Sequence, residues 1–230
     1  MGRTIVAMGG GQEPNDPAFG YLAGLLDTPR PKVCLLPTAA SAVPLAVMQF
    51  LTAFPTDRFE PSYLDLFARD GRDLRAFLLS QDAIFVSGGN TANMLAIWRL
   101  HGVDAVLREA WEAGVVLAGA SAGANCWFEA CTTDSFGPLA PLADGLGLLA
   151  GSFCPHYDAE PARRPLYHEL IANGFAPGIA CDDLAAVRFD GSGIAEVVAS
   201  YADARAYRVT TGADGVVTEA PLPARQLTAG

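Results

Sequence analysis

The sequence contains few of the residues on which several kinds of catalysis depend. Lysine occurs once among 230 residues, at Lys32, which leaves almost no material for Schiff-base chemistry or a phosphate-binding P-loop. Histidine occurs three times, so any histidine base must be His101, His156 or His168. The H-E-x-x-H motif is missing and His and Cys do not cluster. We therefore expect a protein that needs neither a metal nor a cofactor.

Positive charge and long apolar runs are also scarce. Fifteen basic residues face 25 acidic ones, for a net charge of −10, which argues against a broad surface for nucleic acid or anionic membranes. No apolar run reaches the roughly 18 residues of a membrane-spanning helix, and the N-terminal MGRTIVAMGGG is too short for a signal peptide. The five cysteines form no C-x-x-C pair, as expected for reduced thiols. We expect a cytoplasmic protein without nucleic-acid or membrane partners.

Apolar residues make up 51% of the chain and fall into short runs that alternate with helical patterns. The candidate strands are 4–8, 32–36, 62–66, 82–87, 115–119, 148–154 and 178–181, and the candidate helices are 17–27, 42–54, 71–80, 91–101, 103–113, 121–130 and 162–174. This order predicts βαβ units and a mostly parallel central sheet with helices on both faces. Residues 185–220 instead show strand-like alternation and the turn signals DGSG and GADG, which predicts an antiparallel C-terminal meander at the sheet edge. We expect a single α/β domain over residues 1–230.

The clearest motif is GASAG at 119–123, a G-x-S-x-G sequence. It follows the apolar run VVLAG and opens a helical pattern of small residues. In this context a nucleophile elbow exposes its serine at a tight strand-to-helix turn. Ser121 would then stand at the carboxyl end of the sheet, where open α/β folds bind ligands, and the next amide, on Ala122, could stabilise an oxyanion. An ordinary turn rich in small residues is the alternative interpretation.

A nucleophilic serine needs a base, and His156 is the best candidate among the three histidines. His101 ends a helical pattern just before a glycine, where a cation suits the helix C-terminus. His168 lies within the helical pattern PLYHELI, where a solvated helix face is expected. His156 follows the apolar run LLAGSFCP at the end of a predicted core strand, where catalytic residues of α/β sheets gather. The candidates for the acid of a triad are Asp134, Asp158, Glu160, Asp182 and Asp183.

Two further glycine-rich turns follow predicted strands. In SGGNT at 87–91, Gly88 and Gly89 allow a close approach of the backbone, and Asn90 or Thr91 can cap the next helix. A well-formed βα turn would explain this motif by itself, but beside an elbow serine its free amides are candidates for a second oxyanion donor. GGG at 9–11 is a weaker signal of the same kind. It does not complete G-x-G-x-x-G, because position 14 is proline.

Together these motifs resemble the dipeptidase E (aspartyl dipeptidase) family of serine peptidases. The resemblance rests on MGGG, SGGNT, GASAGAN, the TTD that follows it, and PHY with a downstream arginine. It implies a flavodoxin-like three-layer sandwich, the fold of class I glutamine amidotransferases, with serine in place of their nucleophilic cysteine. It also implies that the chain hydrolyses dipeptides with an N-terminal aspartate (Asp-X) through an acyl-enzyme, without a cofactor.

The resemblance assigns catalytic roles residue by residue. It matches Ser121 to the nucleophile and His156 to the base. Asp134, in the polar break TTDS, is the nearest match to the triad acid, with Asp158 and Glu160 as alternatives. These assignments imply the Ser-His-Asp mechanism, in which the histidine moves protons and the acid orients it.

The resemblance also assigns binding roles. It makes the amides of Gly89 and Ala122 the oxyanion donors. The residues expected at the substrate are Gly88, Asn90, Thr91 and Arg163. Arg163 is the best match to an arginine that holds the substrate carboxylate, a role suited to a guanidinium. A solvated first turn of a helix would equally explain Arg163 and its neighbour Arg164.

Two other functions are compatible with the sequence. A cyanophycinase-like serine hydrolase shares the fold and the serine, but a polymer substrate needs a wide groove, and 230 residues leave few insertions to build one. A non-catalytic binding module would not need Ser121 and His156, and both are present. We expect a small peptide as the substrate, and a homodimer is compatible with the resemblance.

Overall fold

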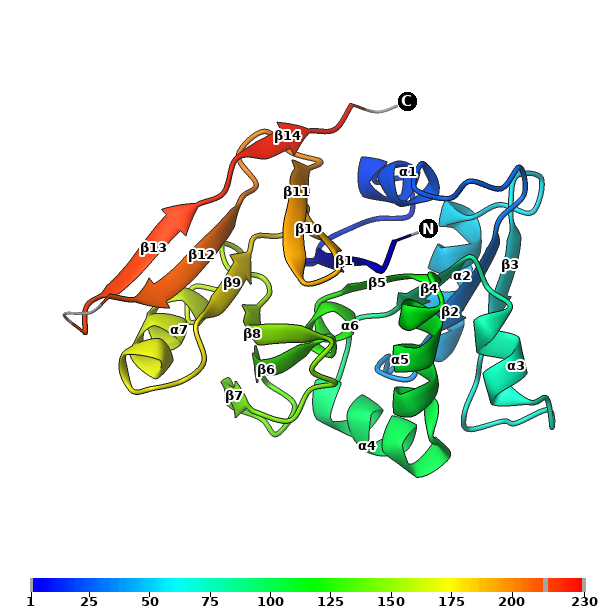
Figure 1. The fold of residues 1–230 in the computed structure, drawn as a ribbon, viewed down its shortest axis with the longest axis horizontal. Coiled ribbons are helices and arrows are strands. Elements are labelled where there is room, and N and C mark those ends of the chain that lie inside the picture. Colours follow the sequence, from blue (N-terminus) through cyan, green and yellow to red (C-terminus); the bar gives the residue numbers. More distant parts are fainter. Residues whose placement is uncertain (1, 213–214, 229–230) are drawn as a thin grey trace.

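The computed structural model describes residues 2–212 and 215–228 and shows a mixed α/β fold around an eight-stranded sheet (Figure 1). In spatial order its strands are β14 (Ala224–Gln226), β11 (Gly193–Ala199), β10 (Ala185–Asp190), β1 (Thr4–Met8), β5 (Val116–Ala120), β4 (Ala83–Val86), β2 (Lys32–Leu36) and β3 (Glu60–Tyr63). The five neighbouring strands β1, β5, β4, β2 and β3 run parallel to one another, and β10 is antiparallel to both β1 and β11. The predicted mostly parallel central sheet is confirmed.

The helices are α1 (Pro17–Ala23), α2 (Val43–Ala53), α3 (Leu74–Leu79), α4 (Thr91–His101), α5 (Val103–Glu112), α6 (Ala122–Asn125) and α7 (Arg163–Ala172). They cover both faces of the sheet, which is why its inner strands β1, β5 and β4 are buried along nearly their whole length. Successive residues of β1 belong to opposite cores: Val6 packs with the side of α1 and α2, and Ile5 with the side of α3, α4, α5 and α6. Within the described ranges no helix combines the length and the hydropathy that crossing a membrane requires.

A second, six-stranded sheet lies beside the central one (Figure 1). Its strands in spatial order are β13 (Val217–Pro221), β12 (Ala206–Thr211), β9 (Gly178–Cys181), β8 (Leu149–Cys154), β6 (Phe128–Thr133) and β7 (Ala140–Leu142). The helix α7 packs on it around a separate small core that contains Tyr157, Tyr167 and Val209.

The second sheet corrects part of the expected topology. The helix expected over 121–130 ends at Asn125, and Phe128–Thr133 form β6, because Phe128 stacks on Phe153 of the parallel strand β8 and these residue types favour strands. The predicted strands 148–154 and 178–181 lie in this second sheet. The predicted meander is divided, since β10 and β11 extend the central sheet and β12 and β13 the second one. Residues 213–214 of the GADG turn lie outside the described residues.

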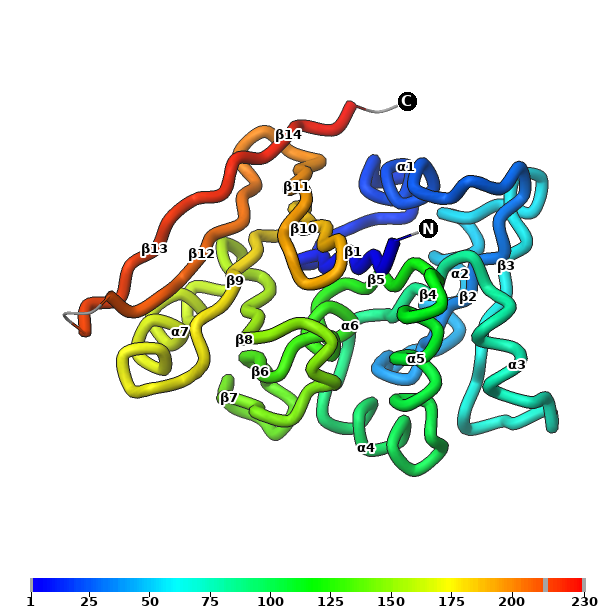
Figure 2. Tube along the Cα trace, in the orientation of Figure 1, coloured from blue at the N-terminus to red at the C-terminus, as the bar shows by residue number. Residues whose placement is uncertain are grey.

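The fold brings several strand ends to one place. In the parallel sheet Met8 pairs with Ala120 and Val86 with Gly119, so the turns that follow β1, β4 and β5 are neighbours. Segments after β8 and β9 reach the same place, because the amide of His156 donates to the carbonyl of Gly9 over 3.3 Å and the amide of Leu184 to Gly10 over 2.8 Å. Figure 2 shows the blue, green and yellow parts of the trace converging there. The predicted site residues Ser121 and His156 lie at this convergence.

Candidate active site

Ser121 occupies a strained turn between β5 and α6. Its backbone has φ 55° and ψ −116°, a region that residues other than glycine rarely adopt. The turn is possible because its flanks are glycines: a Cβ atom on Gly119 would lie 2.3 Å from the Gly123 carbonyl oxygen, and one on Gly123 would lie 2.2 Å from that of Val86. The amide of Ser121 donates to the carbonyl of Met8 over 3.1 Å. This geometry is that of a nucleophile elbow.

His156 lies against the serine hydroxyl. Its Nε2 is 2.8 Å from the Ser121 Oγ atom, within hydrogen-bond distance. The imidazole is seated on the turn after β1, since a Cβ atom on Gly10 would lie 2.1 Å from the His156 Cε1 atom. Glycine in the GGG turn therefore makes room for the histidine ring, a role that the sequence does not reveal because the two segments are far apart in the chain.

Asp183 completes the chain of hydrogen bonds. Its Oδ1 atom lies 2.6 Å from His156 Nδ1, and its own amide donates to Asp158 Oδ1 over 2.8 Å. The carboxylate that lies against His156 Nδ1 thus comes from the segment after β9, whereas the expectation named Asp134. Asp134 lies in the loop after β6, where its side chain is exposed and makes no hydrogen bond within the described residues. Asp134 and His156 follow the neighbouring parallel strands β6 and β8, but among the described residues the carboxylate bonded to His156 is that of Asp183.

The other candidate acids have separate places. Asp158 orients the backbone at Asp183, and Glu160 forms an ion pair with Arg163. Asp182 is buried, and its Oδ2 atom accepts a hydrogen bond of 2.9 Å from the amide of Arg205. Its Oδ1 atom accepts none from the described residues. Burial, aided by the negative charge of Asp158, raises the pKa of Asp182 to about 6.

Replacement of Asp182 by asparagine is expected to stabilise the protein at neutral pH. An aspartate in the unfolded chain has a pKa of about 3.9. Between about pH 3.9 and about pH 6, this carboxyl is deprotonated in the unfolded chain but still protonated in the folded protein. The free energy of unfolding therefore falls as the pH rises through this range. Asparagine removes this loss and can still accept the Arg205 amide. We expect the free energy of unfolding of Asp182→Asn to exceed that of the wild type by roughly 1–3 kcal/mol at pH 7.5, and by less at pH 5.

Urea denaturation at the two pH values measures this difference. Asp203→Asn is the control, because Asp203 is an exposed aspartate and should behave as the wild type does at both. An Asp182→Asn gain that is equal at pH 5 and pH 7.5 would contradict the titration of this carboxyl.

The two amides predicted as oxyanion donors belong to the turns that follow β4 and β5. Gly89 has φ 135°, and a Cβ atom on it would lie 2.0 Å from the Ala39 carbonyl oxygen, so glycine alone fits there. Ala122 is the first residue of α6, where an amide has no acceptor within the helix. Neither amide donates a hydrogen bond to another described residue, so both are free to bind a negatively charged oxygen. Gly88 packs against Ser121 beside them, since a Cβ atom on Gly88 would lie 3.4 Å from the serine Cβ atom.

The side chains of Asn90 and Thr91 form hydrogen bonds next to the glycine turn that follows β4. Asn90 caps α4 by accepting the Asn93 amide over 2.9 Å, and its amide nitrogen donates to the Ser135 carbonyl over 2.9 Å. Thr91 is buried and accepts from Asn125 Nδ2 over 3.3 Å. These contacts fix the position of the glycine turn. Direct contact of Asn90 and Thr91 with a substrate stays a prediction.

Arg163 does not have the freedom that a substrate clamp needs. Its side chain is 4% exposed and pairs with Glu160 over 2.7 Å, while Nη1 donates to the Thr132 carbonyl over 3.3 Å. These contacts tie α7 to β6 through the guanidinium, and contact of Arg163 with a substrate carboxylate stays a prediction. Arg164 is also engaged, since it pairs with Glu219 over 3.0 Å and stacks over the ring of Tyr157.

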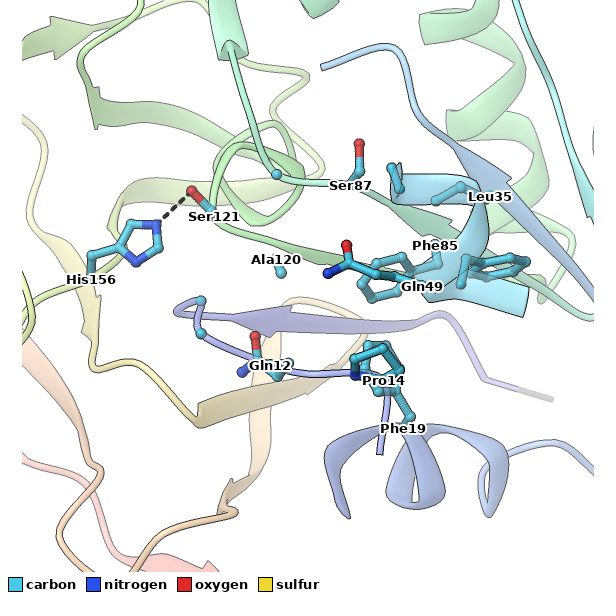
Figure 3. A pocket seen from close by; sticks show the side chains of 15 residues that line it. Gln12, Pro14, Phe19, Leu35, Gln49, Phe85, Ser87, Ala120, Ser121 and His156 are labelled. Atoms are coloured by element: carbon cyan, nitrogen blue, oxygen red, sulfur yellow. Dashed lines mark hydrogen bonds between the residues drawn. The ribbon is translucent and has the colours of Figure 1, made fainter. Parts of the chain in front are cut away.

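A cavity of about 330 Å³ opens beside Ser121 and His156 (Figure 3). It extends from these two side chains past the turn after β1 toward α1 and α2. Its apolar walls are Pro14, Phe19, Leu35, Ala46, Phe50 and Phe85. The volume is at the lower end of the roughly 300–1,000 Å³ typical of small-ligand sites, which suits a ligand of dipeptide size.

The described residues offer no evident metal site or second nucleophile. No group of three or more His, Cys, Asp or Glu side chains suited to a metal occurs in 2–212 and 215–228. All five cysteines are buried with free thiols, and burial raises the pKa of each thiol. A buried thiol with a raised pKa is a poor nucleophile at neutral pH.

Comparison with known proteins finds relatives among the peptidases. The family model of Peptidase family S51 matches residues 5–197. The uncharacterized peptidase YgaJ of Bacillus subtilis (strain 168) is 46% identical over 230 residues, which cover 98% of this chain and 99% of that protein. Peptidase E of Streptomyces coelicolor is 29% identical over 149 residues, 60% of each chain. The crystal structure of a peptidase from an acI-B1 actinobacterium shares the fold, with a TM-score of 0.64, 18% identity and coverage of 99% of this chain and 96% of that one.

Proposed function

The chain belongs to peptidase family S51, and from this premise we propose that Ser121, His156 and Asp183 form a catalytic triad that hydrolyses a peptide bond through an acyl-enzyme. The observation that carries the proposal is the unbroken series of hydrogen bonds from Ser121 Oγ through His156 to Asp183. Its support is the strained backbone of Ser121, since strain of this kind persists where the surrounding structure enforces it, often at active sites.

The first half of the reaction forms the acyl-enzyme. Ser121 Oγ attacks the carbonyl carbon of the substrate while His156 Nε2 takes the hydroxyl proton. The negative charge on the former carbonyl oxygen is stabilised by the amides of Gly89 and Ala122. His156 then gives its proton to the leaving nitrogen, the C–N bond breaks, and the amine departs. Asp183 holds the Nδ1 proton and stabilises the charged imidazole throughout.

The second half reverses these roles with water. His156 Nε2 takes a proton from a water molecule, and the resulting hydroxide attacks the ester carbonyl of the acyl-enzyme. The tetrahedral intermediate uses the same two amides. When the C–O bond to Ser121 breaks, His156 returns the proton to the serine oxygen, and the carboxylic acid product leaves. Atoms and protons balance without any group beyond the triad, the two amides and water.

Small peptides are the proposed substrates. The 330 Å³ of the cavity supports this size. The motifs that resemble the dipeptidase E family imply a more specific substrate, a dipeptide with an N-terminal aspartate. An aspartate side chain needs a cation, and Arg163, the residue expected to supply it, is buried in an ion pair with Glu160.

Labelling with a fluorophosphonate tests the proposed nucleophile. An activated serine displaces fluoride and becomes a phosphonate ester, so we expect a single adduct on Ser121 in peptide mass spectrometry and a parallel loss of dipeptide hydrolysis. His156→Ala should react far more slowly, because the base is missing. A folded wild-type protein that stays unlabelled would contradict the proposal and favour a non-catalytic binding module.

A further inference from the structure

The described side chains that line the cavity beside Ser121 offer no counterion to an acidic substrate. Among the described residues that line it, none is Asp, Glu, Lys or Arg, and His156 is already engaged by Ser121 and Asp183. Arg163 and Arg164, which follow His156 in the sequence, do not line the cavity and are paired with Glu160 and Glu219. A carboxylate that entered this cavity would lose water without gaining a counterion, which is unfavourable.

The deep end of the cavity is instead suited to a large apolar group. Phe50 and Phe85 are buried there at 4% and 8% exposure, and Leu35 at 1%. The ring centroids of Phe19 and Phe85 are 5.5 Å apart, and those of Phe50 and Phe85 6.4 Å. Figure 3 shows Phe19 and Phe85 on the side of the cavity away from Ser121 and His156. Apolar contact of this kind favours an aliphatic or aromatic side chain.

Polar groups near the nucleophile lack partners. Both side-chain amide atoms of Gln12 are shielded from solvent and form no hydrogen bond with the described residues, and the same holds for Ser87 Oγ. Ser87 is 8% exposed and lines the cavity together with Gln12. Buried polar groups are ordinarily paired, so their lack of partners points to a ligand. A peptide group carries one donor and one acceptor, which matches the amide of Gln12.

We propose that this cavity is the specificity site of the enzyme and binds a bulky, uncharged side chain, such as that of phenylalanine or leucine, from a residue next to the cleaved bond. Gln12 hydrogen-bonds the substrate main chain at its entrance. The assignment rests on the proposed serine peptidase function and replaces an acidic substrate preference at this cavity with an apolar one.

Hydrolysis of four dipeptides tests the assignment: Phe-Ala, Ala-Phe, Asp-Ala and Ala-Ala. Burial of one aromatic side chain predicts a kcat/KM roughly 10- to 100-fold above that of Ala-Ala. We expect Phe-Ala or Ala-Phe to show this increase, and the better of the two identifies the side of the bond that the cavity serves. Asp-Ala should not exceed Ala-Ala. The assignment is overturned if neither Phe-Ala nor Ala-Phe has a kcat/KM at least tenfold above those of both Asp-Ala and Ala-Ala.

Binding to Ser121→Ala separates this assignment from the proposed chemistry. Calorimetric titration of the peptides into this variant, which does not cleave them, measures their binding affinity without the chemical step. At least tenfold tighter binding of a Phe dipeptide than of Asp-Ala supports the assignment, whether or not the wild type cleaves any of the four peptides. A wild type that cleaves none of them would count against the serine peptidase function alone. Equal binding, or tighter binding of Asp-Ala, overturns the assignment even where hydrolysis is observed.

A charge placed at the cavity should change its preference. Gln49 lines the cavity from the exposed side of α2, and both arginine and methionine are good helix formers. Gln49→Arg is expected to tighten Asp-Ala binding at least fivefold relative to the uncharged control Gln49→Met, since it supplies the missing counterion. An unchanged Asp-Ala to Phe-Ala ratio between the two variants would mean that the substrate side chain lies elsewhere.

Discussion

Replacement of Ser121 by alanine is expected to lower kcat for peptide hydrolysis roughly 10⁵- to 10⁶-fold, the loss typical of a missing nucleophile in a triad. The reason is that no other described nucleophile lies against His156 Nε2, which is 2.8 Å from Ser121 Oγ. The substitution keeps the Cβ atom in its strained turn, so thermal unfolding should match that of the wild type. Initial rates of amine release from a cleaved dipeptide measure the effect.

Two control variants accompany the Ser121→Ala measurement. Ser192→Ala changes an exposed serine in the turn between β10 and β11 and should retain full activity. Ser121→Gly should be as inactive as Ser121→Ala but more stable than it by roughly 1 kcal/mol, because glycine adopts φ 55° and ψ −116° without steric cost. Retention of more than a hundredth of the activity in Ser121→Ala would exclude Ser121 as the nucleophile.

Replacement of Asp183 by asparagine is expected to lower kcat roughly 10³- to 10⁴-fold, with little change in KM. The amide of asparagine can donate to His156 Nδ1 and so favour the tautomer that cannot accept the Ser121 proton. It also removes the charge that stabilises the imidazolium. Steady-state kinetics on one dipeptide, with folding checked by circular dichroism, measures the loss.

Asp134→Asn is the matched control for this substitution. Asp134 is exposed in the loop after β6 and makes no side-chain hydrogen bond within the described residues, so we expect less than about a twofold change in kcat. The opposite pattern, with Asp134→Asn impaired and Asp183→Asn active, would restore the acid that the family resemblance implies and contradict the role assigned to Asp183.

Local signals were strong where one segment of chain forms the feature. GASAG already combines the small residues that a strained turn requires with a preceding apolar strand, so Ser121 could be predicted from its own neighbours. His156 could be selected because the chain has three histidines and one of them follows a core strand. Asn90 could be recognised as a helix cap, and the structure shows that cap on α4.

Features that depend on contacts between distant segments could not be predicted in this way. The segment 121–130 has small and apolar residues compatible with a helix, but pairing with β8 makes its second half a strand. Arg163 has the sequence context of a solvated helix turn, yet burial against Thr132 and Glu160 removes it from the solvent. Propensity is a weak predictor where tertiary packing supplies more free energy.

The sequence by itself determined the alternation of buried strands and helices, the elbow at Ser121 and the choice of His156 as the candidate base, because each depends on residues close together in the chain. Tertiary structure decided which of five carboxylates reaches His156, why Gly10 must lack a side chain, and that the described residues lining the cavity beside Ser121 include no Lys or Arg. Those outcomes depend on how the ends of β1, β5, β8 and β9 are placed relative to one another. That placement brings His156 and Asp183, 27 positions apart in the sequence, to a hydrogen-bond distance of 2.6 Å.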